Sequence, residues 1–190
     1  MLKLHPETTL ITNIEEDHLD VYKDLADIEA SFHQLGMQTK KAVFGNIFEH
    51  DRHIYCGEGT AAEKYFGVEF IGKSRWPFFW RHRITERTIA NGWQQLGEIE
   101  LQVPGEFNMM NALGARTIAR EYGIDDAITH RALKAFRGIW RRFEKVGELD
   151  GALVISDYGH HPTAIKGTLA AAKEFYPGRR VVLLFEPHQH

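Results

Sequence analysis

The last forty or so residues change hydrophobic period twice, and this alternation constrains the fold more than any other feature of the chain. Residues 152–155 (ALVI) are a short apolar strand, and Pro162 opens a helix after a polar loop, since proline is favoured in a first helical turn. The helix ends where Pro177 precedes Gly178, and residues 181–185 (VVLLF) form a second apolar strand. Strand, helix and strand in this order predict a βαβ unit, with which a doubly wound, Rossmann-like sheet begins.

The preceding part of the chain predicts a mixed sheet. Short β-branched or alternating runs indicate strands at residues 9–14, 42–47, 53–56, 68–71 and 98–103. Asn91 and Gly92 are expected to form a hairpin turn, because both residues accept the positive φ angles of a type I′ turn.

Three helices are expected beside these strands. The first runs from about Leu19 to Gly36, with an apolar face made by Val21, Leu25, Ile28, Phe32 and Leu35. The second follows Gly105 and ends at Gly123. The third runs from about Asp126 to Gly138, and Ile128, Ala132 and Phe136 lie in line along it. Together with the strands, these helices place the chain in the α/β class.

Composition excludes several classes of protein. The 190 residues are 43% hydrophobic and 26% charged, which is typical of a folded globular chain. A net charge of −3 gives no basic stripe for nucleic acid. Cys56 is the single cysteine, so no internal disulfide forms and a reducing, cytoplasmic location is expected. No apolar run approaches the roughly 20 residues that span a bilayer, and the N-terminus lacks a signal-peptide core.

One motif match is interpreted as coincidence. Residues 67–74 (GVEFIGKS) fit the phosphate-loop pattern G-x-x-x-x-G-K-[ST] letter for letter. The pattern works when a flexible loop wraps its backbone N–H groups around phosphates at the start of a helix. Here the intervening residues are bulky and typical of a strand, and the aromatic segment that follows is a poor helix start.

An acidic loop after the first strand is a candidate site for a cation or phosphate. Residues 12–20 (TNIEEDHLD) place His18 among carboxylates just past a strand end, where α/β folds bind such ligands. From the residues alone, an acidic helix start that complements the helix dipole, with His18 on the surface, is the favoured alternative.

Two further segments carry groups suited to a nucleotide. Asn108 and Asn111 lie three residues apart on one helix face, and paired amides match the edge of a purine. The alternative is that Asn108 caps the helix. Arg141 and Arg142 are suited to clamping phosphate at a domain junction, and their alternative is an interdomain salt bridge.

Residues 156–163 (SDYGHHPT) form the densest candidate site, because they follow a buried strand and open a helix. Asp157 suits a ribose hydroxyl or a metal ion, and His160 and His161 suit phosphate. A hydrolytic metal site is the rival interpretation, but no second acidic or histidine partner lies one helical turn away.

Taken together, these segments resemble the Mur ligase family across essentially the whole chain. TNIEEDHLD resembles the central-domain motif T-N-I-x-x-D-H-L-D, and PGEFNMMNALGA resembles G-x-H-N-x-x-N-x-x-A. FRGIWRRFEKVG is similar to F-x-G-x-x-R-R-F-E, SDYGHHPTAI to D-D-Y-x-H-H-P-T-E-I, and LLFEPHQH to a segment containing F-Q-P-H-R. Five motifs in the family's order make the resemblance specific.

The resemblance implies a fold and domain organisation. Residues 1–139 would be a partial central, ATP-binding domain, a mixed sheet with helices that lacks its phosphate-loop part. Residues 140–190 would be the truncated start of the C-terminal domain, with its first βαβ unit.

The resemblance also implies a reaction. The double histidine points to the branch that joins L-alanine to UDP-N-acetylmuramate through an acyl phosphate, or to the branch that ligates recycled tripeptide. ATP and Mg²⁺ would be the cofactors, both substrates would be small molecules, and neither nucleic acid nor membrane would be a partner.

Roles for individual residues follow from the same resemblance. His18 would help to hold Mg²⁺, Asn108 and Asn111 would contact adenine, and Arg142 and Asp157 would sit at the nucleotide between the domains. His18, Arg142 and Asp157 are the residues expected to serve catalysis. The interdomain cleft would be lined by His160, His161 and His188.

Several positions depart from the family pattern, which puts the corresponding contacts in doubt. Phe107 stands where the family has histidine, and the other departures are Ser156, Ala164, Glu186 and Gln189. The family's glycine-rich phosphate loop and its upstream metal-binding glutamate are not found in the sequence. The 190 residues alone are therefore expected to lack ligase activity. A nucleotide-binding or scaffold module without catalysis, and a metal-dependent hydrolase suggested by the histidine count, are the alternatives.

Overall fold

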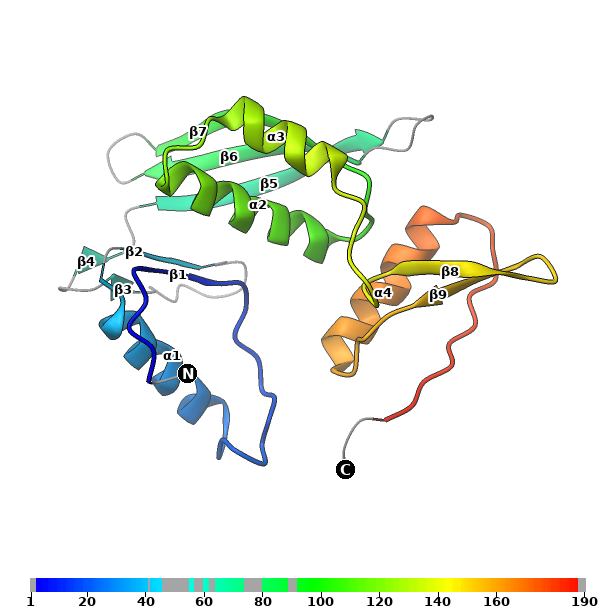
Figure 1. Cartoon of the computed structure of the whole chain (residues 1–190), viewed down its shortest axis with the longest axis horizontal. Coiled ribbons are helices and arrows are strands. Elements are labelled where there is room, and N and C mark those ends of the chain that lie inside the picture. The colour runs from blue at the N-terminus through cyan, green and yellow to red at the C-terminus, as the bar shows by residue number, and fades with distance from the viewer. Residues whose placement is uncertain are drawn as a thin grey trace.

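The computed structural model describes residues 3–40, 42–45, 55–56, 60–61, 64–73, 80–88 and 92–187, with side-chain detail for 3–40 and 97–187. The chain begins with strand β1 (Thr8–Ile11), helix α1 (Leu25–Gln38) and strand β2 (Ala42–Gly45). β1 and β2 pair in parallel, with Thr8 opposite Ala42 (Figure 1). Because a helix connects two parallel strands, this N-terminal segment is a βαβ unit.

Helix α1 begins later than its hydrophobic pattern predicts. Asp24 caps it, since its carboxylate accepts a hydrogen bond from Asp27 N at 3.0 Å. Val21 lies before the cap and is 71% exposed, so its place on the predicted helical face was wrong. The predicted end at Gly36 was also wrong, because the helix continues to Gln38 with Gly36 buried inside it. Thr39, the C-cap residue, bonds Thr9 on β1 through their hydroxyls at 2.7 Å.

An antiparallel sheet forms the middle of the chain. Two short strands, β3 (Tyr55–Cys56) and β4 (Thr60–Ala61), pair with each other, and β5 (Lys64–Lys73), β6 (Trp80–Thr88) and β7 (Gly92–Leu101) form a three-stranded sheet in that order. The predicted hairpin exists between β6 and β7, but Gly92 is the first residue of β7, opposite Thr88, and not a turn residue, while Asn91 lies outside the described residues. Residues 67–73 of the phosphate-loop match run inside β5, so its interpretation as a coincidence is confirmed.

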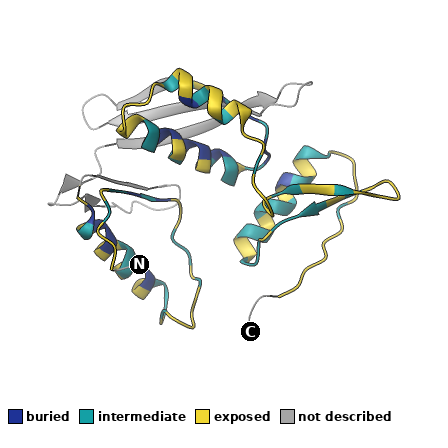
Figure 2. Cartoon of the chain, in the orientation of Figure 1, coloured by how far each residue is buried: buried dark blue, intermediate teal, exposed yellow. Residues whose placement is uncertain are grey.

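Helices α2 (Glu106–Glu121) and α3 (Asp126–Ala135) follow this sheet, and α3 contacts β7 (Figure 1). One buried hydrophobic cluster joins the end of β7 to α2 and consists of Ile99, Leu101, Val103, Met109, Ala112 and Leu113. Dark, buried positions accordingly line α2 in Figure 2. The residues predicted to lie in line along α3 do not form its buried face. Ile128 and Phe136 are 51% and 42% exposed, whereas Thr129 is buried. α3 also ends at Ala135, before Gly138.

The C-terminal part begins with a hairpin that the sequence pattern did not predict. β8 (Glu144–Leu149) pairs antiparallel with β9 (Ala152–Ser156). Asp150 and Gly151 connect them with φ angles of +49° and +79°, the sign that a type I′ turn requires at both central residues. Helix α4 (Pro162–Phe175) lies along this hairpin, and His161 caps its N-terminus (Figure 1).

The predicted strand at residues 181–185 was wrong, and with it the C-terminal βαβ unit. These residues pair with no strand in the part of the chain that is described. Among the described strands, β9 pairs with β8 alone. Leu184 is 95% exposed, whereas a leucine in a central strand would be buried. Within the described residues, no helix is long and apolar enough to cross a membrane.

Candidate functional site at the junction of the two parts

The acidic loop 12–20 has a fixed backbone around His18. His18 adopts a φ of +56°, and its N–H donates to Asp17 Oδ1 at 2.8 Å. The N–H groups of Val21 and Tyr22 both donate to His18 O, at 2.8 and 3.0 Å. The loop therefore turns at His18 and leaves its imidazole exposed to solvent, which is the arrangement a ligand-binding side chain needs.

His161 joins this loop to the C-terminal part. Its Nε2 lies 3.2 Å from the backbone oxygen of Glu16, and its Nδ1 lies 3.0 Å from Glu15 Oε2. A carbonyl oxygen only accepts, so Nε2 must carry a proton and donate. As the N-cap residue of α4, His161 also lies near Thr163 N, at 3.4 Å from Nδ1. One imidazole thus fixes the start of α4 and binds the acidic loop.

A second histidine lies near the same acidic loop. His160 Nε2 lies 3.7 Å from Asp17 Oδ2. Burial raises the pKa of the Asp17 carboxyl, but the hydrogen bond from His18 N and the charges of His18, His160 and His161 outweigh it, so this pKa lies below its usual value. Asp17 therefore stays ionised as a counter-charge to the histidines.

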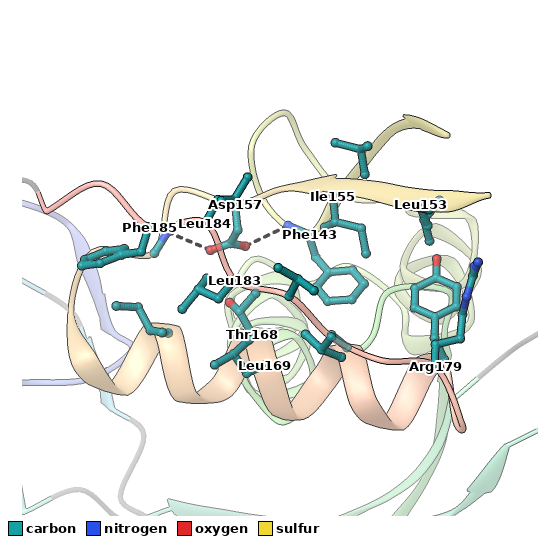
Figure 3. A pocket seen from close by; sticks show the side chains of 18 of the residues that line it. Phe143, Leu153, Ile155, Asp157, Thr168, Leu169, Arg179, Leu183, Leu184 and Phe185 are labelled. Atoms are coloured by element: carbon teal, nitrogen blue, oxygen red, sulfur yellow. Dashed lines mark hydrogen bonds between the residues drawn. The ribbon is translucent and has the colours of Figure 1, made fainter. Parts of the chain in front are cut away.

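Asp157 ties two backbone segments together. Its Oδ2 accepts a hydrogen bond from Phe143 N at 2.9 Å, and its Oδ1 accepts one from Gly159 N at 2.7 Å (Figure 3). A Cβ on Gly159 would lie 2.8 Å from Oδ1, so only glycine allows the loop to fold this tightly around the carboxylate. The turn before β8 and the loop after β9 are therefore held as one unit.

Two arginines surround Tyr158 in this unit. The Arg141 guanidinium lies 4.7 Å from the centre of the Tyr158 ring and that of Arg142 lies 5.8 Å from it, which is cation–π distance. Among the described residues neither guanidinium forms a salt bridge, so the interdomain salt bridge considered for them is not seen there. Both side chains are exposed and are available to an anion.

The two asparagines lie at the start of α2. Asn108 donates through Nδ2 to Pro104 O at 2.7 Å, and Asn111 is exposed. Gly105 is the N-cap residue and makes no side-chain cap. Asn108 therefore ties the first turn of α2 to the segment before it and does not act as an N-cap. The ring of its neighbour Phe107 lies near α4, since a Cβ on Gly167 would be 3.4 Å from Phe107 Cδ1.

The described residues do not by themselves hold a metal ion. No group of three or more histidine, cysteine, aspartate or glutamate side chains converges in this part of the chain. His18 Nε2 lies 3.9 Å from Asp17 Oδ2, so it has one carboxylate neighbour. His188, expected to line the same cleft, lies outside the described residues.

A cavity of about 1100 Å³ separates β9 and α4 from the chain after α4 (Figure 3). Its walls include Leu153, Ile155, Leu169 and Leu183, and Asp157 and His160 lie on its lining as well. Sequence reasoning placed a strand along this groove. The structure leaves the groove open because residues 181–185 do not pair with β9.

Sequence reasoning missed two contributions to the site, that of the pair Glu15 and Glu16 and that of Tyr158. Glu15 and Glu16 were read as part of an acidic helix start, yet they bind His161, which is 145 residues from Glu16. Tyr158 was given no role, yet it lies against both arginines. The only signal for either was its place inside a motif, next to residues with an expected role.

Comparison with known proteins identifies the class that this fold and junction define. The Mur ligase middle domain matches residues 1–119, and the Mur ligase glutamate ligase domain matches residues 141–189. The chain therefore belongs to the Mur ligase family, as its motifs predicted, and its α/β fold class is confirmed.

The relatives are more specific. The whole chain is 39% identical to the UDP-N-acetylmuramate–L-alanine ligase of Salinibacter ruber, of which it covers 40%. It is 34% identical, over 99% of its length, to the protein of the same name from Oleidesulfovibrio alaskensis, of which it covers 42%.

Solved structures agree with these relatives. The crystal structure of UDP-N-acetylmuramate-alanine ligase MurC from Thermotoga maritima superposes with a TM-score of 0.69 at 26% identity, covering 99% of this chain and 43% of that one. The murein peptide ligase mpl from Psychrobacter arcticus shares the fold, with a TM-score of 0.54 at 22% identity over 94% of this chain and 37% of that one. The chain thus spans about two fifths of the length of the relatives it matches.

Proposed function

We propose that this chain is the nucleotide-facing part of an ATP-dependent ligase that joins L-alanine to UDP-N-acetylmuramate in the cytoplasm. The observation that carries the proposal is the meeting of loop 15–18 with loop 157–161, in a chain whose whole length matches proteins named for that reaction. ATP would phosphorylate the substrate carboxylate, and the amine of L-alanine would then displace phosphate from the acyl phosphate. The 190 residues alone are proposed to be inactive.

The described residues can act on such a substrate by position and charge. Arg142 would bind phosphate oxygens, since its guanidinium is exposed at the junction and has no carboxylate partner among the described residues. Asp157 would hold the turn that carries Arg142 beside the bound nucleotide. The carboxylate lone pairs that bind no backbone N–H would accept a hydrogen bond from a ribose hydroxyl. Asn108 and Asn111 would contact adenine.

Histidines would line the substrate side of this junction. In this proposal, the interdomain cleft is lined by His160, His161 and His188. Mg²⁺ would neutralise phosphate charge when bound. His18 would supply one of its ligands, with the others coming from outside the described residues.

A chimera tests the proposal. The matching segment of the Salinibacter ruber ligase is replaced by this chain, and phosphate release is measured with ATP, UDP-N-acetylmuramate and L-alanine. We expect release that requires both substrates, and a loss of at least about a hundredfold in Arg142→Ala, on the scale of losing one preorganised charge contact. Arg137→Ala, an exposed arginine before the junction, is the control and should stay active. A folded chimera without turnover would refute the proposal.

Two alternatives give different results in the same experiments. A tripeptide-recycling ligase would prefer the tripeptide over L-alanine as acceptor in the chimera. A non-catalytic nucleotide-binding remnant would bind Mg-ATP without turnover. Relatives named UDP-N-acetylmuramate–L-alanine ligase that are 34% to 39% identical over 99% to 100% of the chain favour the first proposal.

A further inference from the structure

The ring of Phe107 lies between two glycines from different parts of the chain. A Cβ on Gly105 would lie 2.6 Å from Phe107 Cε1, and a Cβ on Gly167 of α4 would lie 3.4 Å from Phe107 Cδ1. Gly105 has a φ of +94°, which side chains rarely adopt. The first turn of α2 therefore presents an aromatic ring to α4 at a position where α4 has no side chain.

The same face of α4 continues this contact. Gly167, Ala171 and Phe175 are spaced four residues apart, so they lie on one side of the helix. Ala171 is 1% exposed, and Phe175 packs against the core cluster formed by β7 and α2. The face of α4 that is directed at the central part is thus packed from Gly167 to the last turn.

The C-terminal part has almost no buried interior of its own. Among the described residues 141–187, Ala171 is the only one that is buried. Along the same helix face, Phe175 packs against the core cluster of the central part, and a Cβ on Gly167 would lie 3.4 Å from Phe107 Cδ1. At the N-terminus of α4, His161 adds the hydrogen bond to Glu16 O. The buried face of α4 therefore lies at the junction, while the β8–β9 pairing and the hydrogen bonds of Asp157 order the rest of this part.

We propose that Phe107 is a positioning residue that seats α4 against α2 and thereby holds loop 157–161 on loop 15–18. The ring fills the space between Gly105 and Gly167 and fixes the helix in rotation and height. His161, the N-cap residue of α4, then meets the Glu16 carbonyl, and His18 lies two residues after Glu16. This proposal concerns docking alone and does not depend on the ligase reaction.

Distances between two spin labels test the proposal on the whole chain without nucleotide. Cys56 is replaced by serine, and cysteines for labelling are placed at the exposed positions Arg131 on α3 and Lys173 on α4. A single narrow distance distribution is expected for the parent. Phe107→Ala should broaden it and shift the docked-to-undocked ratio by about tenfold or more, since losing a packed aromatic ring costs more than that factor requires.

A variant on the other side of the contact probes the same space. Gly167→Leu should also broaden the distribution, because the longer side chain occupies the place of the ring, while leucine is a good helix former and does not weaken α4. Gly167→Ala should keep the narrow distribution, since its methyl group would lie at ordinary contact distance, 3.4 Å, from the ring. Phe136→Ala removes an exposed ring and should change nothing.

The ¹⁵N shift of His161 Nε2 provides a second readout. It should move toward its solvent value in Phe107→Ala and Gly167→Leu, because the hydrogen bond to Glu16 O is lost on undocking. Far-UV circular dichroism should stay unchanged in both variants. A broad distribution in the parent, a narrow one in either variant, or loss of helix in both would overturn the proposal.

Discussion

The two carboxylate oxygens of Asp157 each accept a backbone N–H, from Phe143 and from Gly159. A side chain that binds two backbone segments supports the site mechanically, whatever it does to a ligand. A backbone hydrogen bond joins the same two segments, because Tyr158 N donates to Arg141 O at 2.9 Å. Hydrogen bonds between residues 141–143 and residues 157–159 thus order the loop that carries the candidate residues.

Asp157→Asn is predicted to destabilise the chain by about 1 to 3 kcal/mol, the cost of leaving a partly buried N–H facing an amide NH₂. Asparagine keeps one acceptor oxygen, so only one of the two backbone hydrogen bonds survives. Urea unfolding followed by fluorescence measures the difference. Asp20→Asn, at an exposed aspartate, is the control and should stay within about 0.5 kcal/mol of the parent. Equal stability of both variants would contradict the role given to Asp157.

The limit of sequence reasoning is clearest for single residues. Sequence reasoning selected His161 as a site candidate, because it follows a strand and opens a helix. Its partner Glu16 is 145 residues away, and no local pattern reveals such a contact. Asn108 shows the same limit, since its amide binds Pro104 O in a geometry set by the positive φ of Gly105.

Between helices α2 and α3, the chain buries a charged cluster. Arg116 is fully buried and its Nη2 lies 2.6 Å from Asp126 Oδ2. The Nε and Nη1 atoms of Arg116, and Nε2 of His130, have no hydrogen-bond partner among the described residues. Buried cations without full partnership are costly, so the packing of α3 on α2 depends on Asp126.

Asp126→Ala is predicted to cost about 2 to 3 kcal/mol, because it leaves the Arg116 guanidinium buried and uncompensated. The value is below that of a fully buried pair, since the Asp126 side chain is 39% exposed. Adding Arg116→Met should recover most of this loss, because methionine fills the space without a charge. Chemical unfolding of the two variants checks both values. A double variant less stable than Asp126→Ala would contradict the explanation.

His130 gives this helix pair a pH dependence. Burial, and after it the charge of Arg116, lower the pKa of His130 below 6.5 in the folded chain, against the opposing charges of Asp126 and Asp125. The unfolded chain therefore binds more protons just below pH 6.5, so this stability is present above that pH and is lost as the pH falls through the folded pKa. Urea midpoints between pH 7.5 and 5 should fall less steeply in His130→Gln. His5→Gln, at an exposed histidine, should leave the slope unchanged.

Elements were predictable where their signal is local. α4 has a proline start and a glycine after its end, and it appears as expected. β8 was missed because its sequence, EKVGEL, has one β-branched residue and largely polar neighbours, and it forms only by pairing with β9. Residues 181–185 show the opposite error. Their composition is typical of a strand, but a strand also needs a neighbouring strand to pair with. The sequence of the segment does not show whether such a neighbour is present.

At the scale of the whole chain, stability is distributed unevenly between the two parts. The largest buried cluster of the described residues belongs to β7 and α2, and β1 and α1 add Ile11, Ile28 and Leu35, while residues 141–187 contribute Ala171 as their one buried position. The family models divide the chain in the same region, with matches to residues 1–119 and 141–189. A boundary in sequence is therefore not a boundary in folding, because α4 uses the core of its neighbour.

A peptide of residues 141–190 is therefore predicted to be largely unfolded in isolation. A segment of about 50 residues normally needs its own core or a cross-link to fold, and here the apolar face of α4 is covered by α2 and the β7 core. Circular dichroism of the peptide should show little helix. A two-state transition is expected for the whole 190-residue chain, in which α4 unfolds together with α2, and hydrogen exchange of their amides should report one common free energy. Cooperative unfolding of the isolated peptide would show that the C-terminal part is an independent domain and that its contact with α2 is incidental.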